Sequence, residues 1–279
     1  DDISVESLTG FGNMNATAES AALEARGITP RHFSRAGDRR RAGFLEAAGG
    51  GTLLVTRGDI AADLGLPVQA VVAYARSFAD GAHTSIPAPG LGALAAARGG
   101  RDSALAHALS DLGLSADDIA VVSKHDTSTR ANDPNEAELH SRLSAALGRS
   151  EGNPLYVVSQ KTLTGHAKGG AALFQAVGLI DIFRRQEIPA NRSLDCLDSD
   201  MAQWMPLLWL RKPLDVSASP VRAGVLTSLG FGHIAAMVVL AHPGAFEAAL
   251  LAERCEAALA QWRERAQARL EEGRRHLDE

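Results

Sequence analysis

The chain has few of the residues that build disulfide-linked scaffolds or nucleic-acid surfaces. Its 279 residues include two cysteines, and aromatic residues account for 5% of the sequence. Two cysteines cannot form the disulfide framework of a small secreted domain, and so few aromatic rings leave little surface for base stacking. The 28 lysines and arginines are outnumbered by 33 aspartates and glutamates, which gives a net charge of −5. Without a basic surface, we expect no nucleic-acid partner.

Long apolar runs are also missing, although 46% of the residues are hydrophobic and can fill a substantial core. No run approaches the roughly 18 apolar residues that a membrane-spanning helix needs. The sequence has no initiating methionine, and residues 1–4 do not begin a charged-then-apolar leader. We therefore expect a cytoplasmic chain without a membrane span that is a segment of a longer polypeptide.

Short apolar runs alternate with helical stretches along the sequence, as in an α/β protein. The predicted strands cover residues 52–56, 68–74, 119–122, 155–158, 223–227 and 235–241, and the predicted helices cover residues 59–64, 92–112 and 245–277. A passage rich in proline and other turn residues, 85–90, interrupts this alternation and separates two halves. The sequence therefore predicts a layered α/β fold.

The chemically active side chains are concentrated in two neighbouring motifs. His125 follows the predicted strand 119–122, Lys161 follows the strand 155–158, and His166 comes five residues later. Ligand crevices of open α/β sheets form beyond the carboxyl ends of strands, so these residues lie where a site is expected. Imidazoles beside an ammonium group and small hydroxyls can polarise a carbonyl and stabilise an enolate. This cluster predicts carbon–carbon bond chemistry on a thioester.

Three motifs occur in order along the chain: His-Asp-Thr-Ser-Thr at 125–129, Lys-Thr-Leu-Thr-Gly-His at 161–166 and Thr-Ser-Leu-Gly-Phe-Gly at 227–232. Together they resemble the β-ketoacyl-carrier-protein synthase, or ketosynthase, domain of the thiolase-like superfamily. Further segments are similar to the type I fatty acid synthases of fungi and actinobacteria, at 131–136, 152–155 and 189–192. An aspartate at position 126 favours the bacterial branch of these type I fatty acid synthases.

The resemblance extends from about Phe11 to about Pro243 and implies a thiolase-like layered α/β/α/β/α sandwich. The chain would contain the end of the first half of that sandwich and the complete second half. We expect residues 1–85 to be the remainder of the N-terminal ketosynthase half and residues 86–243 to be the C-terminal half with both histidine motifs. Residues 244–279 are expected to form a packing or assembly helix.

The nucleophilic cysteine of the family is expected upstream of this chain, because in ketosynthases it precedes a segment like the one at 10–14. Cys196 is a poor candidate, since the carboxylates of Asp195 and Asp198 would raise the pKa of its thiol and suppress the thiolate. Cys255 lies in a predicted helix, where we expect it to pack. The chain is therefore expected to be inactive and unstable alone.

The resemblance implies a decarboxylative Claisen condensation of malonyl-carrier protein with an acyl group bound to that cysteine. His125 and His166 would donate ring N–H hydrogen bonds to the malonyl thioester oxygen and stabilise the enolate. Lys161 would disfavour a charged His166 and help to keep it in the donor tautomer. These three residues are the expected catalytic group.

The resemblance implies roles for two further groups of residues. Thr127 and Thr129 would bind the phosphopantetheine arm, whose amides suit short hydroxyl side chains. Phe231, between Gly230 and Gly232, would gate the acyl pocket, and its backbone N–H would join that of the missing cysteine in an oxyanion hole. No metal site is expected, because the histidines lack the spacing of zinc ligands.

The resemblance also implies a molecular context. We expect no cofactor on this segment, because 4′-phosphopantetheine arrives on the acyl carrier protein and NADPH and FMN belong to other domains of the parent synthase. The expected partners are the upstream cysteine-bearing part of the same domain and the acyl carrier protein. A second ketosynthase should complete a homodimeric pair within a larger homo-oligomeric synthase.

Structural explanations remain open for several of these residues. Lys161 could pair with Glu136 or Asp133 instead of contributing to a site. Thr127 and Thr129 could cap a strand end, as short hydroxyl side chains often do. Both alternatives would place the residues near the histidines without giving them a chemical role.

Three other features have structural interpretations. The arginine run 39–41 is expected to form a solvated or salt-bridged face rather than a clamp for an acidic carrier protein. Residues 90–95 superficially fit a dinucleotide-binding fingerprint, but Pro87 and Pro89 precede them where a strand should be, so nicotinamide binding is rejected. Gln175 occupies a position at which many stand-alone ketosynthases have glutamate.

Three functional hypotheses remain. The first is a decarboxylating ketosynthase segment of a multifunctional fatty acid synthase, and the second is a polyketide-type condensing domain or a biosynthetic thiolase. The third is a non-catalytic ketosynthase-like structural or chain-length partner. A thiolase should have a second active cysteine near the last glycine-rich loop, and residues 227–233 contain none. A non-catalytic partner should lack the nucleophilic cysteine upstream.

Overall fold

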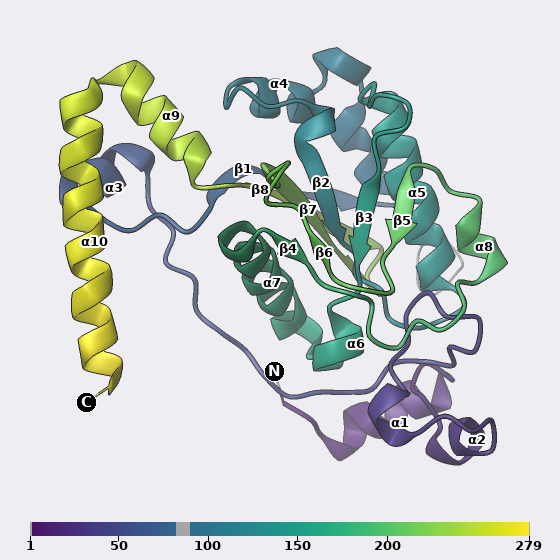
Figure 1. Cartoon of the computed structure of the whole chain (residues 1–279). Coiled ribbons are helices and arrows are strands. Elements are labelled where there is room, and N and C mark those ends of the chain that lie inside the picture. The colour runs from purple at the N-terminus through teal and green to yellow at the C-terminus, as the bar shows by residue number, and fades with distance from the viewer. Residues whose placement is uncertain (1, 82–89, 279) are drawn as a thin grey trace.

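A six-stranded mixed sheet forms the centre of the molecule (Figure 1). The computed structural model describes residues 2–81 and 90–278. In the strand order β1-β8-β7-β2-β3-β5, the strands β7, β2, β3 and β5 run parallel, whereas β8 pairs antiparallel with both β1 and β7. These strands are β1 (Val71–Ala79), β2 (Ile119–Ser123), β3 (Leu155–Val158), β5 (Leu207–Trp209), β7 (Ala223–Gly230) and β8 (Ile234–Ala241). A small antiparallel sheet consists of β4 (Glu187–Ile188) and β6 (Leu214–Asp215).

Helices cover both faces of the central sheet, α5 (Asn132–Ala146) on one side and α7 (Ala171–Arg185) on the other (Figure 1). The other α-helices are α1 (Val5–Asn13), α2 (Ser20–Glu24), α3 (Gly58–Leu64), α4 (Ala104–Ser110), α6 (Lys161–Thr164), α8 (Ser199–Ala202), α9 (Gly244–Glu253) and α10 (Glu256–Asp278). Short 3-10 helices occur at Pro30–His32, Leu91–Ala97, Gly100–Asp102, Ala116–Asp118 and Lys168–Gly170. This arrangement confirms the predicted α/β fold class.

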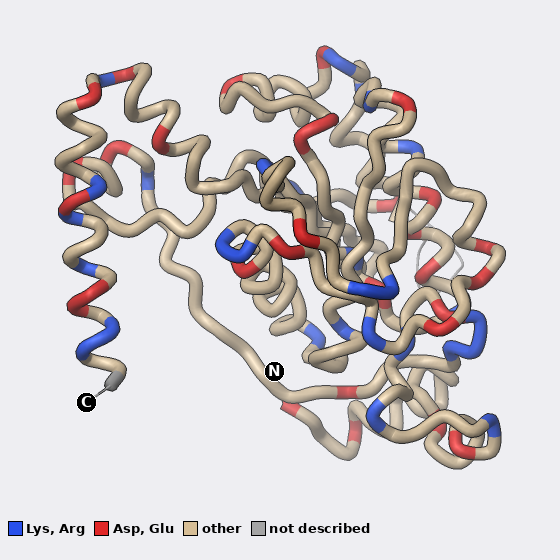
Figure 2. The backbone as a smooth tube through the Cα atoms, viewed as in Figure 1, with Lys and Arg blue, Asp and Glu red and all other residues tan. Residues whose placement is uncertain are grey.

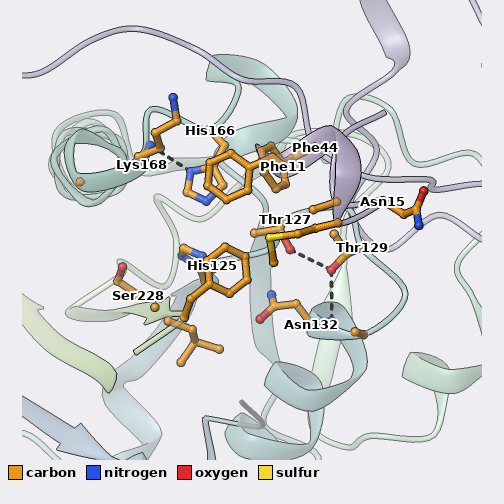
Figure 3. Close-up of a pocket in the computed structure, with 17 residues that line it drawn as sticks. Phe11, Asn15, Phe44, His125, Thr127, Thr129, Asn132, His166, Lys168 and Ser228 are labelled. Atoms are coloured by element: carbon orange, nitrogen blue, oxygen red, sulfur yellow. Dashed lines mark hydrogen bonds between the residues drawn. The ribbon is translucent and has the colours of Figure 1, made fainter. Parts of the chain in front are cut away.

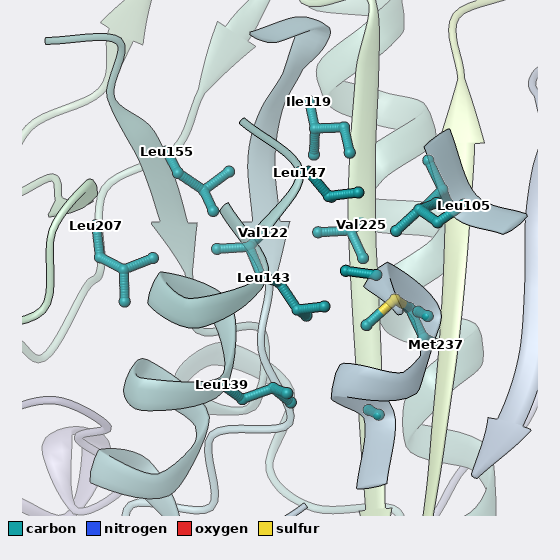
Figure 4. Packing of buried hydrophobic residues seen from close by; sticks show 14 of the residues in the cluster. Leu105, Ile119, Val122, Leu139, Leu143, Leu147, Leu155, Leu207, Val225 and Met237 are labelled. Carbon is teal, nitrogen blue, oxygen red and sulfur yellow. The ribbon is translucent and has the colours of Figure 1, made fainter. Parts of the chain in front are cut away.

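The alternation of side chains along β2 and β3 explains why two helical layers form. Val122 packs in one apolar cluster with Leu143 of α5 (Figure 4). Val157 belongs to the same cluster. Their neighbours Val121 and Val158 face α7 and belong to a second cluster. Successive strand residues point to opposite faces, so a continuously apolar strand fills two cores at once. The packed sheet thereby fixes the carboxyl ends of β2 and β3.

The strands that lead to the histidine motifs are confirmed with small changes at their ends. β3 occupies the predicted residues, and β2 extends the prediction by one residue to Ser123. β7 continues beyond its predicted end to Gly230, and β8 starts one residue early at Ile234. The strand predicted at 68–74 is displaced toward the C-terminus, because β1 covers Val71–Ala79.

The strand predicted at 52–56 is wrong. This segment is not part of either sheet, and Leu54 and Val55 are 89% and 71% exposed. An apolar, β-branched run forms a strand only where a neighbouring strand can complete its hydrogen bonds. Residues 48–57 instead form a connection without regular secondary structure that runs from the N-terminal region to α3 (Figure 1).

Two long predicted helices are interrupted. The stretch predicted at 92–112 contains 3-10 turns and α4, because Gly99 and Gly100 adopt φ angles of 97° and 64°. The stretch predicted at 245–277 divides into α9 and α10 at Arg254, where φ is −120° and ψ is −100°. Cys255 follows this break and is exposed, so its predicted packing role is wrong.

The long helix α10 packs beside α3 and α9 at one side of the sheet, and acidic and basic residues alternate along it (Figures 1 and 2). Trp262 Nε1 donates a hydrogen bond to the Leu66 carbonyl at 3.0 Å. The Arg265 guanidinium donates to the carbonyls of Ala62 and Asp63 at 2.9 and 2.8 Å, which satisfies groups near the end of α3. Among the described residues, no helix is long and apolar enough to cross a membrane.

The predicted domain boundary at residue 85 lies outside the described residues, as does the turn-rich passage up to residue 89. β1 precedes this boundary, but it pairs with β8 along its length, from Val71 opposite Ala241 to Ala79 opposite Ile234. Segments on both sides of the boundary therefore share one sheet. The division into two ketosynthase halves stays a prediction.

Candidate active site

A cavity of about 370 Å³ lies at the carboxyl ends of β2 and β7, where their loops meet the N-terminal region (Figure 3). Its polar lining includes His125, Thr127, Thr129, Asn132, His166, Lys168 and Ser228, and its aromatic lining consists of Phe11, Phe44 and Phe231. Ligand sites usually combine an apolar wall with a few converging polar groups. The structure therefore brings both predicted histidines and both predicted threonines to one cavity.

The loop that carries His125 is attached to α5 by a buried carboxylate. Glu136 accepts the backbone N–H of His125 through Oε1 and that of Asp126 through Oε2, both at 2.7 Å. The same carboxylate accepts the Asn132 side-chain amide at 3.0 Å and the Thr227 hydroxyl at 2.8 Å. From the sequence, this carboxylate is expected only as a possible partner of Lys161, and its support of the loop is not predicted.

Lys161 contacts His125 rather than the carboxylates of Glu136 and Asp133. Its Nζ donates to the His125 carbonyl at 2.5 Å and lies 3.2 Å from the His125 Nδ1. An ammonium group that donates to Nδ1 leaves the imidazole proton on Nε2. Lys161 therefore selects the Nε2–H tautomer of His125, whereas sequence analysis assigned this effect to His166.

His166 is oriented by three backbone hydrogen bonds. Its N–H donates to the Leu45 carbonyl at 2.8 Å, and its carbonyl accepts the Ala47 N–H at 3.2 Å. The backbone N–H of Lys168 donates to His166 Nδ1 at 3.1 Å, so this imidazole also carries its proton on Nε2. The ring centroids of His125 and His166 are 5.1 Å apart, and the planes are nearly perpendicular at 85°. The cavity thus contains two neighbouring Nε2–H donors.

Burial and a nearby cation keep both imidazoles neutral. Desolvation, followed by the charge of Lys161, lowers the pKa of His125 well below its usual value and that of His166 to about 3. Desolvation also lowers the pKa of Lys161, to about 8, although the surrounding carboxylates oppose this shift. Near neutral pH the site therefore contains two neutral imidazoles beside one charged lysine.

The hydroxyls of Thr127 and Thr129 are 3.0 Å apart and both line the cavity. Thr129 Oγ1 also accepts the backbone N–H of Asn132 at 3.2 Å, at the start of α5. Thr129 therefore contacts the first residue of α5, and this structural contact coexists with its position in the cavity (Figure 3).

Three aromatic side chains from distant parts of the chain form the apolar wall. Phe11 of α1 lies 5.3 Å from Phe44 and 5.7 Å from Phe231, measured between ring centroids. Phe44 in turn packs edge-on against His166 at 4.9 Å. Phe231 lies in the turn between β7 and β8 and is 42% exposed, at the edge of the cavity. The sequence predicts Phe231 as a gate of the acyl pocket, which stays a prediction, and it does not predict that Phe11 and Phe44 line the cavity.

The two glycines beside Phe231 differ in their surroundings. Gly230 is the last residue of β7 and lines the cavity. Gly232 lies in the following turn, and a Cβ atom there would meet no heavy atom of the described residues within 4 Å. Space alone would permit a side chain at Gly232, so its predicted part in gating stays a prediction.

Buried ion pairs support the loop from behind. Lys124 Nζ lies 2.6 Å from Asp126 Oδ1 and donates to the Asp133 carbonyl at 3.2 Å. Asp126 also accepts the Ser159 hydroxyl at 2.5 Å, which connects the loops after β2 and β3. Burial raises the pKa of Asp133 to about 7. The charge of Arg41, whose Nε lies 3.3 Å from Asp133 Oδ2, opposes this increase. The arginine run thus forms salt bridges as predicted, but Arg41 is 1% exposed and not on the surface.

Gln175 connects β2 and β7 beneath the histidine loop. Its Nε2 donates to the carbonyls of Ser123, Lys124 and Thr227 at 2.7, 2.9 and 3.2 Å. Three converging carbonyls require a donor, which an ionised glutamate cannot provide. The amide nitrogen of Gln175 therefore fits its surroundings, whereas its Oε1 is buried without a hydrogen-bond partner among the described residues.

The two cysteines lie away from the cavity. Cys196 and Cys255 are both exposed, and neither lines the cavity. Within residues 2–81 and 90–278, no group of three or more histidine, cysteine, aspartate or glutamate side chains could bind a metal ion.

Solved structures define the class of fold. A noncanonical ketosynthase from P. aeruginosa matches 94% of this chain and 40% of its own length, with a TM-score of 0.81 and 24% sequence identity. A ketosynthase from a type II polyketide synthase, solved with its acyl carrier protein and a bound hexaketide, matches with a TM-score of 0.65, also at 24% identity. That alignment covers 84% of this chain and 52% of the other. The chain has a thiolase-like ketosynthase fold.

Sequence comparisons identify the family. Residues 69–195 match the family model described as "Beta-ketoacyl synthase, C-terminal domain". This segment belongs to that family, and it includes His125, Lys161 and His166. The resemblance inferred from the three motifs is therefore confirmed.

Comparison with curated proteins shows similarity to a narrower group, the fungal fatty acid synthases. The chain is 36% identical over 240 residues to fatty acid synthase 2 of Mycosarcoma maydis. This alignment covers 86% of this chain and 6% of the relative. It is 36% identical over 278 residues to a fatty acid synthase alpha subunit of Dothistroma septosporum, covering 90% of this chain and 16% of the relative. The corresponding subunit of Saccharomyces cerevisiae is 29% identical over 339 residues. This alignment covers 91% of this chain and 18% of the relative. The chain thus spans a small part of the length of these relatives.

Proposed function

We propose that this chain provides the histidine-bearing part of a ketosynthase site that performs decarboxylative Claisen condensation in a multifunctional fatty acid synthase. The observation that carries the proposal is the pair of neutral imidazoles in one cavity. The Nδ1 atoms of His125 and His166 are each engaged by a donor, so both rings offer Nε2–H groups. The relationship to fatty acid synthases supports the biological context.

The proposed reaction begins when the malonyl thioester enters the cavity. His125 and His166 donate to the thioester carbonyl oxygen through Nε2–H. The bond between the α-carbon and the malonyl carboxylate breaks, carbon dioxide leaves, and the electron pair forms an enolate that these donors stabilise. The charge of Lys161, which contacts His125, favours the same negative intermediate.

The enolate carbon then attacks an acyl thioester on a cysteine that we place outside this chain. A carbon–carbon bond forms, the carbon–sulfur bond of the acyl thioester breaks, and the cysteine leaves as a thiolate. Phe231 would gate this acyl position, and Thr127 and Thr129 would bind the phosphopantetheine arm. The aromatic wall and the paired hydroxyls of the cavity support these assignments.

The proposed partners follow from this chemistry. An acyl carrier protein would deliver malonate on 4′-phosphopantetheine, and one ketosynthase with a similar fold was solved with its carrier protein. The cysteine-bearing part of the domain and a second ketosynthase in a homodimer would complete the site. NADPH and FMN would act in other domains of the cytoplasmic synthase.

The His166→Ala substitution in the full-length protein tests the proposed role. We expect it to abolish malonyl decarboxylation and to leave acylation of the nucleophilic cysteine measurable, because His166 acts mainly on the enolate. Release of carbon dioxide from malonyl-carrier protein and intact-mass detection of the acyl-enzyme measure the two steps separately. Normal decarboxylation by this variant would refute the role of His166.

Labelling with cerulenin, an inhibitor directed at the cysteine of condensing enzymes, distinguishes this function from a non-catalytic partner. We expect intact-mass analysis and peptide mapping of the full-length protein to find the adduct on a cysteine outside this chain. Absence of such an adduct would favour a structural or chain-length role. An adduct at Cys196 would contradict the proposed division of the site, since that residue does not line the cavity.

A further inference from the structure

Lys168 has an uncommon backbone conformation next to His166. Its φ is 47°, in the left-handed region that residues with a Cβ atom adopt at a steric cost. This conformation accompanies the 3.1 Å hydrogen bond from the Lys168 N–H to His166 Nδ1. The bond that selects the Nε2–H tautomer of His166 therefore depends on a strained residue, and the surrounding structure must maintain it.

The side chain of Lys168 is bound by the segment that also orients His166. Lys168 Nζ lies 2.7 Å from Glu46 Oε2 and donates to the Ser7 hydroxyl at 2.9 Å. The Ser7 hydroxyl in turn donates to Glu46 Oε2 at 2.8 Å, and the Glu46 side chain is 2% exposed. Partial burial strengthens such an ion pair relative to one in water.

Glu46 lies between the two residues that bind the His166 backbone. The Leu45 carbonyl accepts the His166 N–H, and the Ala47 N–H donates to the His166 carbonyl. Residues 45–47 therefore hold His166 directly through the main chain and indirectly through the Glu46 contact with Lys168. The first connection binds the His166 main chain, and the second reaches its imidazole through the Lys168 N–H.

We infer that Glu46 and Lys168 are positioning residues, whose ion pair keeps residue 168 in the left-handed conformation and thereby keeps His166 in its Nε2–H tautomer. This inference rests on the proposed function, in which that Nε2–H donates to the thioester oxygen. Without the ion pair, residue 168 relaxes to a right-handed conformation and its N–H leaves Nδ1. The proton can then move to Nδ1, and Nε2 becomes an acceptor that cannot stabilise the enolate.

The test compares Lys168→Ala with the matched control Lys168→Gly in the full-length protein. Both variants remove the ammonium group, but glycine adopts a positive φ without the steric cost. We expect Lys168→Ala to lower the kcat of malonyl decarboxylation by about tenfold or more, with KM changed by less than about twofold. We expect Lys168→Gly to lose clearly less kcat than Lys168→Ala.

Glu46→Gln and two crystal structures complete the experiment. The Glu46→Gln variant leaves Lys168 in place, and we expect a decrease of kcat in the same direction but smaller than that of Lys168→Ala. Crystal structures should show the residue-168 N–H displaced from His166 Nδ1 in Lys168→Ala and retained in Lys168→Gly.

Two results would overturn the inference. Equal losses of kcat in Lys168→Ala and Lys168→Gly would mean that the ammonium group itself is needed, and a wild-type rate in Lys168→Ala would mean that the ion pair is dispensable. If the wild-type protein does not decarboxylate malonyl-carrier protein, the proposed function fails instead. The two crystal structures would still decide whether Lys168 positions His166.

Discussion

Each half of α5 has a buried face, but the first half buries two carboxylates and an amide, whereas the second half buries two leucines together with His140 and Ser144. In the first half, Asn132, Asp133 and Glu136 are 1%, 0% and 0% exposed and face the loops of the candidate site. In the second half, Leu139 and Leu143 are buried in the largest apolar cluster, against the sheet (Figure 4). One helix therefore connects the site to the core. The comparison suggests that the first half orients the site and that the second half mainly stabilises the fold.

Glu136 is the fully hydrogen-bonded residue of the polar half, whereas Asn132 Oδ1 and Asp133 Oδ1 are buried without a hydrogen-bond partner among the described residues. Glu136 accepts four hydrogen bonds, and Asp133 accepts the Gly37 N–H at 3.1 Å in addition to its contact with Arg41. Buried polar groups cost little when paired but much when a partner is removed. Substitutions in the two halves should therefore differ more in their effect on activity than in their effect on stability.

The largest effect is expected for Glu136→Ala. This substitution leaves the backbone N–H groups of His125 and Asp126 without their acceptor, so it should cost about 3 to 5 kcal/mol in the free energy of unfolding. The histidine loop should also lose its orientation, and kcat for malonyl decarboxylation should fall by about tenfold or more. Urea unfolding and the decarboxylation assay measure the two effects.

Glu136→Gln is the matched control for that substitution. Its side chain retains one acceptor oxygen and nearly the same volume, so the loss of stability and of kcat should be smaller than for Glu136→Ala. Unchanged kcat in Glu136→Ala would contradict the assignment of site orientation to the first half of α5.

Leu143→Ala should affect stability without changing the chemistry. A buried leucine truncated to alanine costs about 2 to 5 kcal/mol, and Leu143 is 5% exposed within the apolar cluster. At temperatures where the variant remains folded, we expect kcat within about twofold of wild type. Leu143→Met, which conserves volume, should cost less than about 1.5 kcal/mol. A large loss of kcat in the folded Leu143→Ala variant would remove the distinction between the two halves.

Sequence analysis located the parts of the site that follow strands. The apolar runs that become β2 and β3 are local patterns, and His125 and Lys161 come just after them. Because parallel strands place their carboxyl ends at one edge of the sheet, this spacing was sufficient to predict that the motifs converge. The three motifs then identified the family, because they are specific and occur in order.

Contacts between distant segments could not be predicted in the same way. Nothing in the local pattern around Phe11 indicates that this residue packs against Phe231. Likewise, nothing around Glu46 indicates its contact with Lys168. The failure at 52–56 has the same origin, since strand formation depends on a neighbour elsewhere in the chain. Tertiary contacts, rather than propensity, decided each of these cases.

An intermediate effect is expected from pH through His140, which lies in the second half of α5. His140 is buried beside Thr227, with Nε2 3.1 Å from the hydroxyl, and desolvation lowers its pKa to about 3. Between pH 6.5 and about 3 the unfolded chain therefore binds a proton that the folded protein does not bind. Stability should be complete above about pH 6.5 and should fall with decreasing pH, by up to about 1.4 kcal/mol per pH unit for this group.

His140→Gln checks this contribution, because glutamine can donate to Thr227 but does not titrate. Urea unfolding between pH 7 and pH 5 should show a shallower loss of stability for the variant than for wild type. The slope should not disappear, since the neutral His125 and His166 contribute with the same sign. Identical slopes in the two proteins would mean that His140 is not a buried neutral imidazole.

The smallest effect is expected on the solvent-exposed side of α5, which contributes to neither the site nor the core. Arg142 donates to Glu138 at 3.0 Å across one helical turn, and the two side chains are 52% and 32% exposed. Exposed pairs at this spacing contribute about 0.3 to 0.5 kcal/mol, because water screens the charges and two long side chains must be ordered. A double-mutant cycle with Glu138→Ala and Arg142→Ala should give a coupling energy in this range that decreases with added salt, with kcat unchanged. A coupling energy above about 1 kcal/mol would show that the exposed side of α5 also contributes substantially to stability. The contrast between the two halves would then not account for all of the stabilising contacts of this helix.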